Sequence, residues 1–139
     1  MQKLNIAILS YRSAPFGGGQ GIYVHDISKA LSLMGHQVDV ISGPPYPNLS
    51  EKINLIKLPG LDLFQTFSFK DRLKTFIKKK NKRAIDFYEF FSTFFGGFPE
   101  MRTFGERAKE FLDQNHHYDI VIDNQSVSYG MLKIQKKFP

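Results

Sequence analysis

Short apolar runs alternate along this chain with longer segments in which apolar residues recur every three or four positions. The runs at residues 4–9, 38–41, 53–58 and 119–123 have the length of β-strands, and most are apolar at nearly every position. Strands of this kind are buried on both faces, as in a parallel sheet. The pattern predicts an α/β fold, a parallel sheet flanked by helices.

The first strand leads through a glycine-rich loop into a helix that ends before Gly35. The apolar residues of this helix recur at the spacing of one helical face. They are Tyr23, Ile27, Ala30, Leu31 and Met34. We predict that this face packs on the sheet.

Four glycines, Gly17, Gly18, Gly19 and Gly21, lie between this strand and helix. Glycine permits positive φ and close approach of the backbone, and the first turn of the helix offers N–H groups to an anion. The cluster therefore predicts a phosphate- or sugar-binding loop, with a tight turn as the alternative. No Gly-Lys-Ser/Thr follows, which excludes a P-loop, and Ile22 stands where a dinucleotide fingerprint needs glycine.

A second polar loop, of Asp123, Asn124, Gln125 and Ser126, follows the last predicted strand. Parallel strands place the loops that follow them at one edge of the sheet, so we expect this loop beside the glycine loop. Amide side chains both donate and accept hydrogen bonds, which suits sugar hydroxyls. The alternative role is capping of the next helix by Asn124 or Ser126.

Residues 60–103 interrupt the alternation with ten phenylalanines and a basic segment. We predict helices over residues 69–80 and 84–95, and a third helix opened by a capping box of Thr103 and Glu106. The inner face of the third helix is predicted to hold Phe104, Ala108, Phe111 and Leu112. The ten phenylalanines are Phe64, Phe67, Phe69, Phe76, Phe87, Phe90, Phe91, Phe94, Phe95 and Phe98.

The formal net charge of +6 is concentrated in residues 70–83, which hold eight basic residues and one acidic residue, Asp71. We consider three interpretations: a solvated basic face over a phenylalanine-rich core, contact with an anionic membrane surface, or contact with nucleic acid. No nucleic-acid recognition motif accompanies the charge, so we expect no nucleic acid partner. The basic residues are Lys70, Arg72, Lys74, Lys78, Lys79, Lys80, Lys82 and Arg83.

The composition sets further bounds. A chain of 139 residues fits one domain with a sizeable core. The absence of cysteine excludes disulfides and thiolate metal sites. No apolar run approaches the ~20 residues of a membrane span, and the first residues do not resemble a signal peptide. We expect a cytoplasmic protein, with possible peripheral contact at the inner membrane face.

Residues 4–45, LNIAILSYRSAPFGGGQGIYVHDISKALSLMGHQVDVISGPP, resemble the amino-terminal signature of glycosyltransferase family 4. Gly18 and Gly19 match the loop glycines of that signature, and Gly35, His36 and Val38 match its helix end. The resemblance implies one half of a GT-B fold, in which two Rossmann-like domains face each other across a cleft. It also implies a retaining transfer from a nucleotide-diphosphate sugar to an acceptor, with no metal or other cofactor.

The resemblance further implies that residues 1–139 are the amino-terminal, acceptor-side domain, that a carboxyl-terminal donor-binding domain is missing, and that this part alone is inactive. Gly18 and Gly19 would hold donor phosphate or sugar. Sugar hydroxyls of donor or acceptor would contact Gln20, Asp123, Asn124 and Gln125. Further candidates on the acceptor side are Tyr11, His25, Glu100 and Arg102.

Several of these assignments have structural alternatives. His25 is alternatively a structural histidine, and Glu100 with Arg102 is alternatively a loop ion pair. In many members of the family a histidine near the loop after the fourth strand touches the transferred sugar, but no histidine occupies that loop here, so no catalytic residue is assigned. The alternative function is a non-catalytic Rossmann-like module that docks on an anionic membrane.

Overall fold

The computed structural model describes residues 2–15, 18–63, 66, 68–124, 126 and 128–138. Four strands form one parallel sheet in the order β3-β2-β1-β4. They are β1 (Asn5–Ser10), β2 (Gln37–Ser42), β3 (Asn54–Lys57) and β4 (Ile120–Asp123). The predicted α/β, Rossmann-like arrangement is therefore confirmed.

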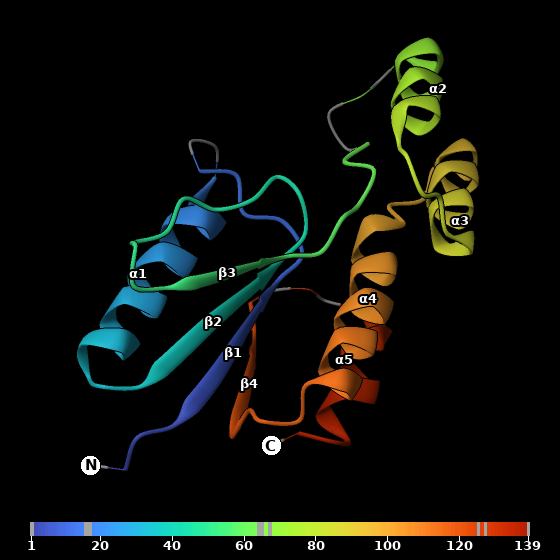
Figure 1. The fold of residues 1–139 in the computed structure, drawn as a ribbon. Helices are drawn as coiled ribbons and strands as arrows, with labels where there is room; N and C mark the ends of the chain where they lie inside the picture. Colours follow the sequence, from blue (N-terminus) through green and yellow to red (C-terminus); the bar gives the residue numbers. More distant parts are fainter. Residues whose placement is uncertain are drawn as a thin grey trace.

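Helices cover both faces of the sheet (Figure 1). Helix α1 (Gly19–Leu33) covers one face, and α4 (Glu100–Gln114) with α5 (Tyr129–Gln135) covers the other. Successive residues of β1 serve the two layers because side chains alternate along a strand. Ile6 and Ile8 join the core under α1, whereas Ala7 and Leu9 join the core under α4 and α5.

The predicted inner face of α1 is partly wrong. Tyr23, Ala30 and Met34 are exposed, and the fully buried residues are Gly21, Val24 and Ser28. The small residues decide this orientation, because a Cβ on Gly21 would lie 2.3 Å from the carbonyl oxygen of Ala14. Glycine is therefore required at this closest contact, which turns Val24 and Ser28 inward and leaves Ile27 and Leu31 partly buried against the core.

Two predicted helix starts are also wrong. Helix α4 begins at Glu100, after Pro99, because proline has the backbone angle that a helix start requires. Thr103 is therefore inside the helix, and its hydroxyl donates to the carbonyl oxygen of Glu100 at 3.1 Å. Helix α5 is capped by Ser128, which accepts from the N–H of Gly130 at 3.2 Å, and not by Asn124 or Ser126.

The segment between β3 and α4 contains α2 (Phe69–Lys78), α3 (Ala84–Ser92) and the 3₁₀ helix η1 (Thr93–Phe95). Both α-helices lie beyond the first turn of α4 (Figure 1). A third core cluster packs α2 and α3 against the chain that precedes α2. In this cluster the rings of Phe76 and Phe90 are stacked, with 4.5 Å between their centroids. Phe91, Phe94, Phe95 and Phe98 are exposed, so the predicted phenylalanine-rich core takes only part of the set. Phe64 and Phe67 lie outside the described residues.

No helix in the described part of the chain is long and apolar enough to cross a membrane.

Candidate functional site

The loops that follow β1 and β4 lie side by side at the carboxyl edge of the sheet, as predicted. Strand β1 pairs with β4 with Leu9 opposite Asp123, and the N–H of Asn124 donates to the Leu9 carbonyl at 2.8 Å. From β1 the chain continues to β2 on one side, while β4 lies on the other side. Such a switch point is where open α/β sheets bind ligands.

The predicted ligand residues of the β4 loop have different environments. Asn124 is buried, and its amide donates to the hydroxyl of Ser10 at 3.4 Å, so it fixes the two loops to each other. Asp123 is exposed and accepts from the N–H of Ser126 at 3.2 Å. The buried hydroxyl of Ser126 has no hydrogen-bond partner among the described residues. Gln125 lies outside the described residues.

The glycine loop contains one residue with a left-handed backbone and one position that is open to a ligand. Gly18 has a φ of 88°, in the left-handed region, and directly precedes α1. A Cβ on Gly19 would meet no atom of the described residues within 4 Å, so packing against them does not require glycine there. Gln20 follows in the first turn of α1 and is half-buried. Gly17 lies outside the described residues.

The start of α4 reaches this edge of the sheet. Arg12, in the loop after β1, and Glu100 form an ion pair at 3.8 Å, and both side chains are largely buried. Arg102 points elsewhere, because its guanidinium donates to the Tyr88 hydroxyl on α3 at 3.5 Å. The structure thus brings Glu100 to the loop after β1 and leaves Arg102 exposed beside α3, so their observed partners are Arg12 and Tyr88.

The two remaining candidates hold the scaffold together. His25 donates from Nδ1 to the carbonyl oxygen of Asn48 at 3.0 Å, which ties α1 to the loop after β2. This contact favours the structural interpretation of His25. Tyr11 is half-buried and packs on the core under α4. Among the described residues, no group of three metal-ligating side chains is placed to hold an ion.

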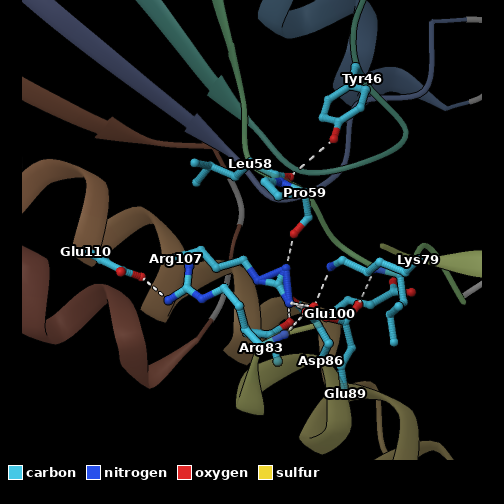
Figure 2. Close-up of polar contacts among 12 residues, drawn as sticks. Tyr46, Leu58, Pro59, Lys79, Arg83, Asp86, Glu89, Glu100, Arg107 and Glu110 are labelled. Atoms are coloured by element: carbon cyan, nitrogen blue, oxygen red, sulfur yellow. Dashed lines mark hydrogen bonds and ion pairs between the residues drawn. The ribbon is translucent and has the colours of Figure 1, made fainter. Parts of the chain in front are cut away.

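Sequence reasoning missed a buried cluster of charges beside this edge (Figure 2). Arg107 of α4 donates to Asp86 at 2.7 Å and to Glu89 at 2.8 Å. Lys79 donates to the same oxygen of Asp86 at 2.5 Å. Arg107 also donates to the carbonyl oxygen of Pro59 after β3. The cluster therefore joins four parts of the chain: the segment that follows α2, helix α3, helix α4 and the loop that follows β3.

The cluster is electrically balanced, with two cations and two anions. Burial raises the pKa of Glu89 above its ordinary value. Burial also pushes the pKa of Asp86 upward, but hydrogen bonds from the Arg83 N–H and Lys79, with the charge of Arg107, bring that pKa below its ordinary value. Removing one member of such a cluster leaves a buried charge unpaired, which is strongly destabilising.

The cluster corrects the expectation that the whole basic segment is solvated. The Lys79 side chain is only 17% exposed and is paired with Asp86. Lys82 donates to the carbonyl oxygen of Lys79 at 2.7 Å and lies over the Phe76 ring at 5.3 Å from its centroid. No local pattern distinguishes these lysines from their neighbours. The buried cluster that holds Lys79 also needs Arg107, which is distant in the sequence and donates to the same oxygen of Asp86.

Comparison with known proteins gives one informative match. No protein-family model matches the chain. Over 135 residues, which is 96% of this chain, it is 41% identical to a curated MMP alpha-(1->4)-mannosyltransferase of Mycolicibacterium hassiacum. The match takes in 32% of that protein, so this chain spans about a third of the relative's length. A mannosyltransferase is a glycosyltransferase, so the match supports the resemblance to glycosyltransferases that the amino-terminal motif carries, and it covers nearly the whole chain.

Proposed function

We propose that this chain is the amino-terminal, acceptor-side part of a retaining glycosyltransferase of the GT-B type. The observation that carries this proposal is the 41% identity to a mannosyltransferase over 96% of the chain. By similarity to that relative, we infer that the whole protein transfers mannose from a nucleotide-diphosphate donor and forms an α-(1→4) bond. Residues 1–139 alone are proposed to be inactive.

In this proposal the amino terminus of α1 receives the donor diphosphate. The helix has 15 residues and carries no acidic residue in its first turn, and no side chain among residues 2–15, 18–63, 66, 68–124, 126 and 128–138 caps its first N–H groups. Exposed N–H groups and the helix dipole favour an anion at this position. The same groups would stabilise the charge that develops on the departing diphosphate, without a metal.

The buried polar residues around the loop have a supporting role. Ser10 hydrogen-bonds to Ser13 and accepts from Asn124, so the two loops are fixed before any ligand binds. The N–H of Ser13 also donates to the carbonyl oxygen of Pro45 at 2.9 Å. We therefore reassign Asn124 from ligand contact to positioning, and we keep Gln20 and Asp123 as candidate contacts to sugar hydroxyls. Such preorganisation is what positioning catalysis requires.

The direct test is a transfer assay with the full-length protein. A panel of nucleotide-diphosphate sugars, including a mannose donor, is offered with α-(1→4)-linked manno-oligosaccharides, and NMR of the product reports the anomeric configuration. We expect a product that retains the donor configuration, with no loss of rate in EDTA. Failure to transfer or hydrolyse any donor would refute the proposal.

A second candidate function is docking on an anionic membrane, and one observation favours it. Helix α2 exposes Phe69 and Ile77 next to Lys70, Lys74 and Lys78. Exposed apolar residues beside cations are typical of helices that lie in a membrane interface. We propose that this face gives the cytoplasmic protein peripheral contact with the inner membrane face.

A further inference from the structure

An open groove lined by aromatic rings lies between α3, the start of α4 and the start of α5. It consists of two hollows of about 460 Å³ each. Tyr88, Arg102 and Tyr129 line both hollows, so the hollows form one continuous groove. Hollows of this size are typical of sites for small-molecule ligands.

Four aromatic residues of the groove are presented to solvent. Phe95 is 90% exposed, Tyr129 81%, Phe98 65% and Tyr88 47%. The backbone explains part of this arrangement: Gly96, with a φ of 70°, ends η1 and turns the chain back toward α4. The turn leaves Phe95 and Phe98 outside the core that buries Phe90. Large apolar surfaces gathered in one hollow usually mark a binding site.

Polar groups are interleaved with the rings. Arg102 donates to the Tyr88 hydroxyl at 3.5 Å, and Ser92 and Ser128 line the same hollow. At the other end of the groove, Lys133 and Glu106 form an ion pair at 2.7 Å. A sugar has C–H faces that stack on the π face of an aromatic ring and hydroxyls that need donors and acceptors at the ring edge.

The charge of the groove favours a neutral ligand. Its charged lining residues are Arg102, Lys133 and Glu106, and the last two neutralise each other. Only the charge of Arg102 remains, which is a smaller cation excess than that of α2, whose four basic residues face one acidic residue. An anionic lipid surface favours the larger excess. A neutral, polyhydroxylated chain with apolar faces fits both the rings and the balance of charge.

The position of the groove connects it to the glycine loop. Ser128, at one end of the groove, follows the β4 loop that pairs with β1. Arg102 shares the first turn of α4 with Glu100, whose carboxylate pairs with Arg12 of the β1 loop. A saccharide whose terminal hydroxyl lies at the two loops would extend from them along the aromatic rings.

We propose that this groove binds the saccharide acceptor over several sugar units, with Phe95 and Tyr129 as stacking platforms and Arg102 as a hydroxyl ligand. The inference rests on the proposed function, because it assumes that the transferred sugar goes to another sugar. It adds the class of acceptor and the residues that set the preferred acceptor length.

The test measures binding of α-(1→4)-linked mannose oligomers of one to four units to the full-length protein by calorimetry. We expect affinity to rise with oligomer length in the wild type. In the double variant Phe95→Ala/Tyr129→Ala, the dissociation constant of the tetramer should rise at least about tenfold and the length dependence should disappear. Tyr129→Phe should retain binding because the ring remains. Leu132→Ala, an exposed residue of the same helix outside the groove, is the matched control.

Further measurements on the double variant separate this inference from the proposed function. The dissociation constant of the donor and the thermal midpoint should not change in the double variant, since both side chains are exposed. Normal mannosyl transfer with unchanged tetramer affinity in the double variant would overturn the groove and leave the function intact. Loss of tetramer binding in the double variant of a protein that transfers no sugar would refute the function and the acceptor role, and would leave the groove as a saccharide-binding site. Loss of binding to anionic vesicles, with tetramer affinity unchanged, would reassign the rings to a membrane surface and overturn the groove.

Discussion

Replacing Gly19 with valine separates what a ligand requires of the glycine loop from what the fold requires. A Cβ at this position meets no atom of the described part of the chain within 4 Å, and Gly19 is the first residue of helix α1. Valine is slightly better than glycine in a helix, so the free energy of unfolding should change by about 0.5 kcal/mol or less. The thermal midpoint should therefore shift by about 2 °C or less.

The effect on activity should be much larger. If the diphosphate lies against the first turn of α1, the valine side chain occupies the space between the phosphate and the backbone N–H groups. Loss of one such donor in other enzymes costs about 100- to 1,000-fold in rate. We expect kcat/KM for transfer by the full-length protein to fall at least about a hundredfold, measured with a nucleotide-diphosphate mannose donor at matched protein concentration.

Gly21→Ala is the matched control with the opposite outcome. Its Cβ would lie 2.3 Å from the carbonyl oxygen of Ala14, so the helix must move. Overpacking of this kind costs about 1–3 kcal/mol, and circular dichroism should show a lower midpoint. Turnover near the wild-type value in Gly19→Val, with its midpoint unchanged, would refute the placement of the donor at this loop.

Three further predictions concern the charges. Arg107→Met should lower the free energy of unfolding by about 3–5 kcal/mol in urea titrations, because the buried Glu89 loses its ion-pair partner and Asp86 keeps only Lys79, whereas Arg83→Ala at an exposed pair should cost about 1 kcal/mol or less. Equal costs would contradict the importance of burial. The pKa of Asp86 is lowered, so the stabilisation by its carboxylate is fully present above the ordinary pKa of 3.8 and is lost as the pH falls below that value. The difference in the free energy of unfolding between wild type and Asp86→Asn should therefore disappear in acid. A difference that does not change with pH would refute the assignment. Changing Lys70, Lys74, Lys78 and Lys80 to Gln should remove most sedimentation with anionic vesicles, at about 1 kcal/mol for each lysine, and should leave the thermal midpoint unchanged. Adding Lys79→Gln should lower that midpoint, and equal sedimentation of the wild type and the four-residue variant would rule out membrane docking.

The sequence by itself determined the strands, their parallel arrangement and the glycine loop. These features depend on local properties. A continuous apolar run fits a strand buried on both faces, and a glycine cluster permits the tight loop that follows the first strand. The sequence also predicted that the loops after β1 and β4 lie at the same edge of the sheet, because the loops that follow parallel strands all lie at the carboxyl edge.

Tertiary structure decided which side chains the elements turn inward and which charges are buried. Helix α1 buries Gly21 and Ser28 instead of Tyr23 and Met34, because the close contact with Ala14 requires glycine there. Lys79 resembles its neighbours in sequence, yet its side chain is only 17% exposed because α3 brings it the buried carboxylate of Asp86, which Arg107 of α4 also contacts. The aromatic groove likewise combines residues of α3, η1, α4 and α5. Such choices depend on contacts between distant segments, and a local pattern of residues carries no information about them.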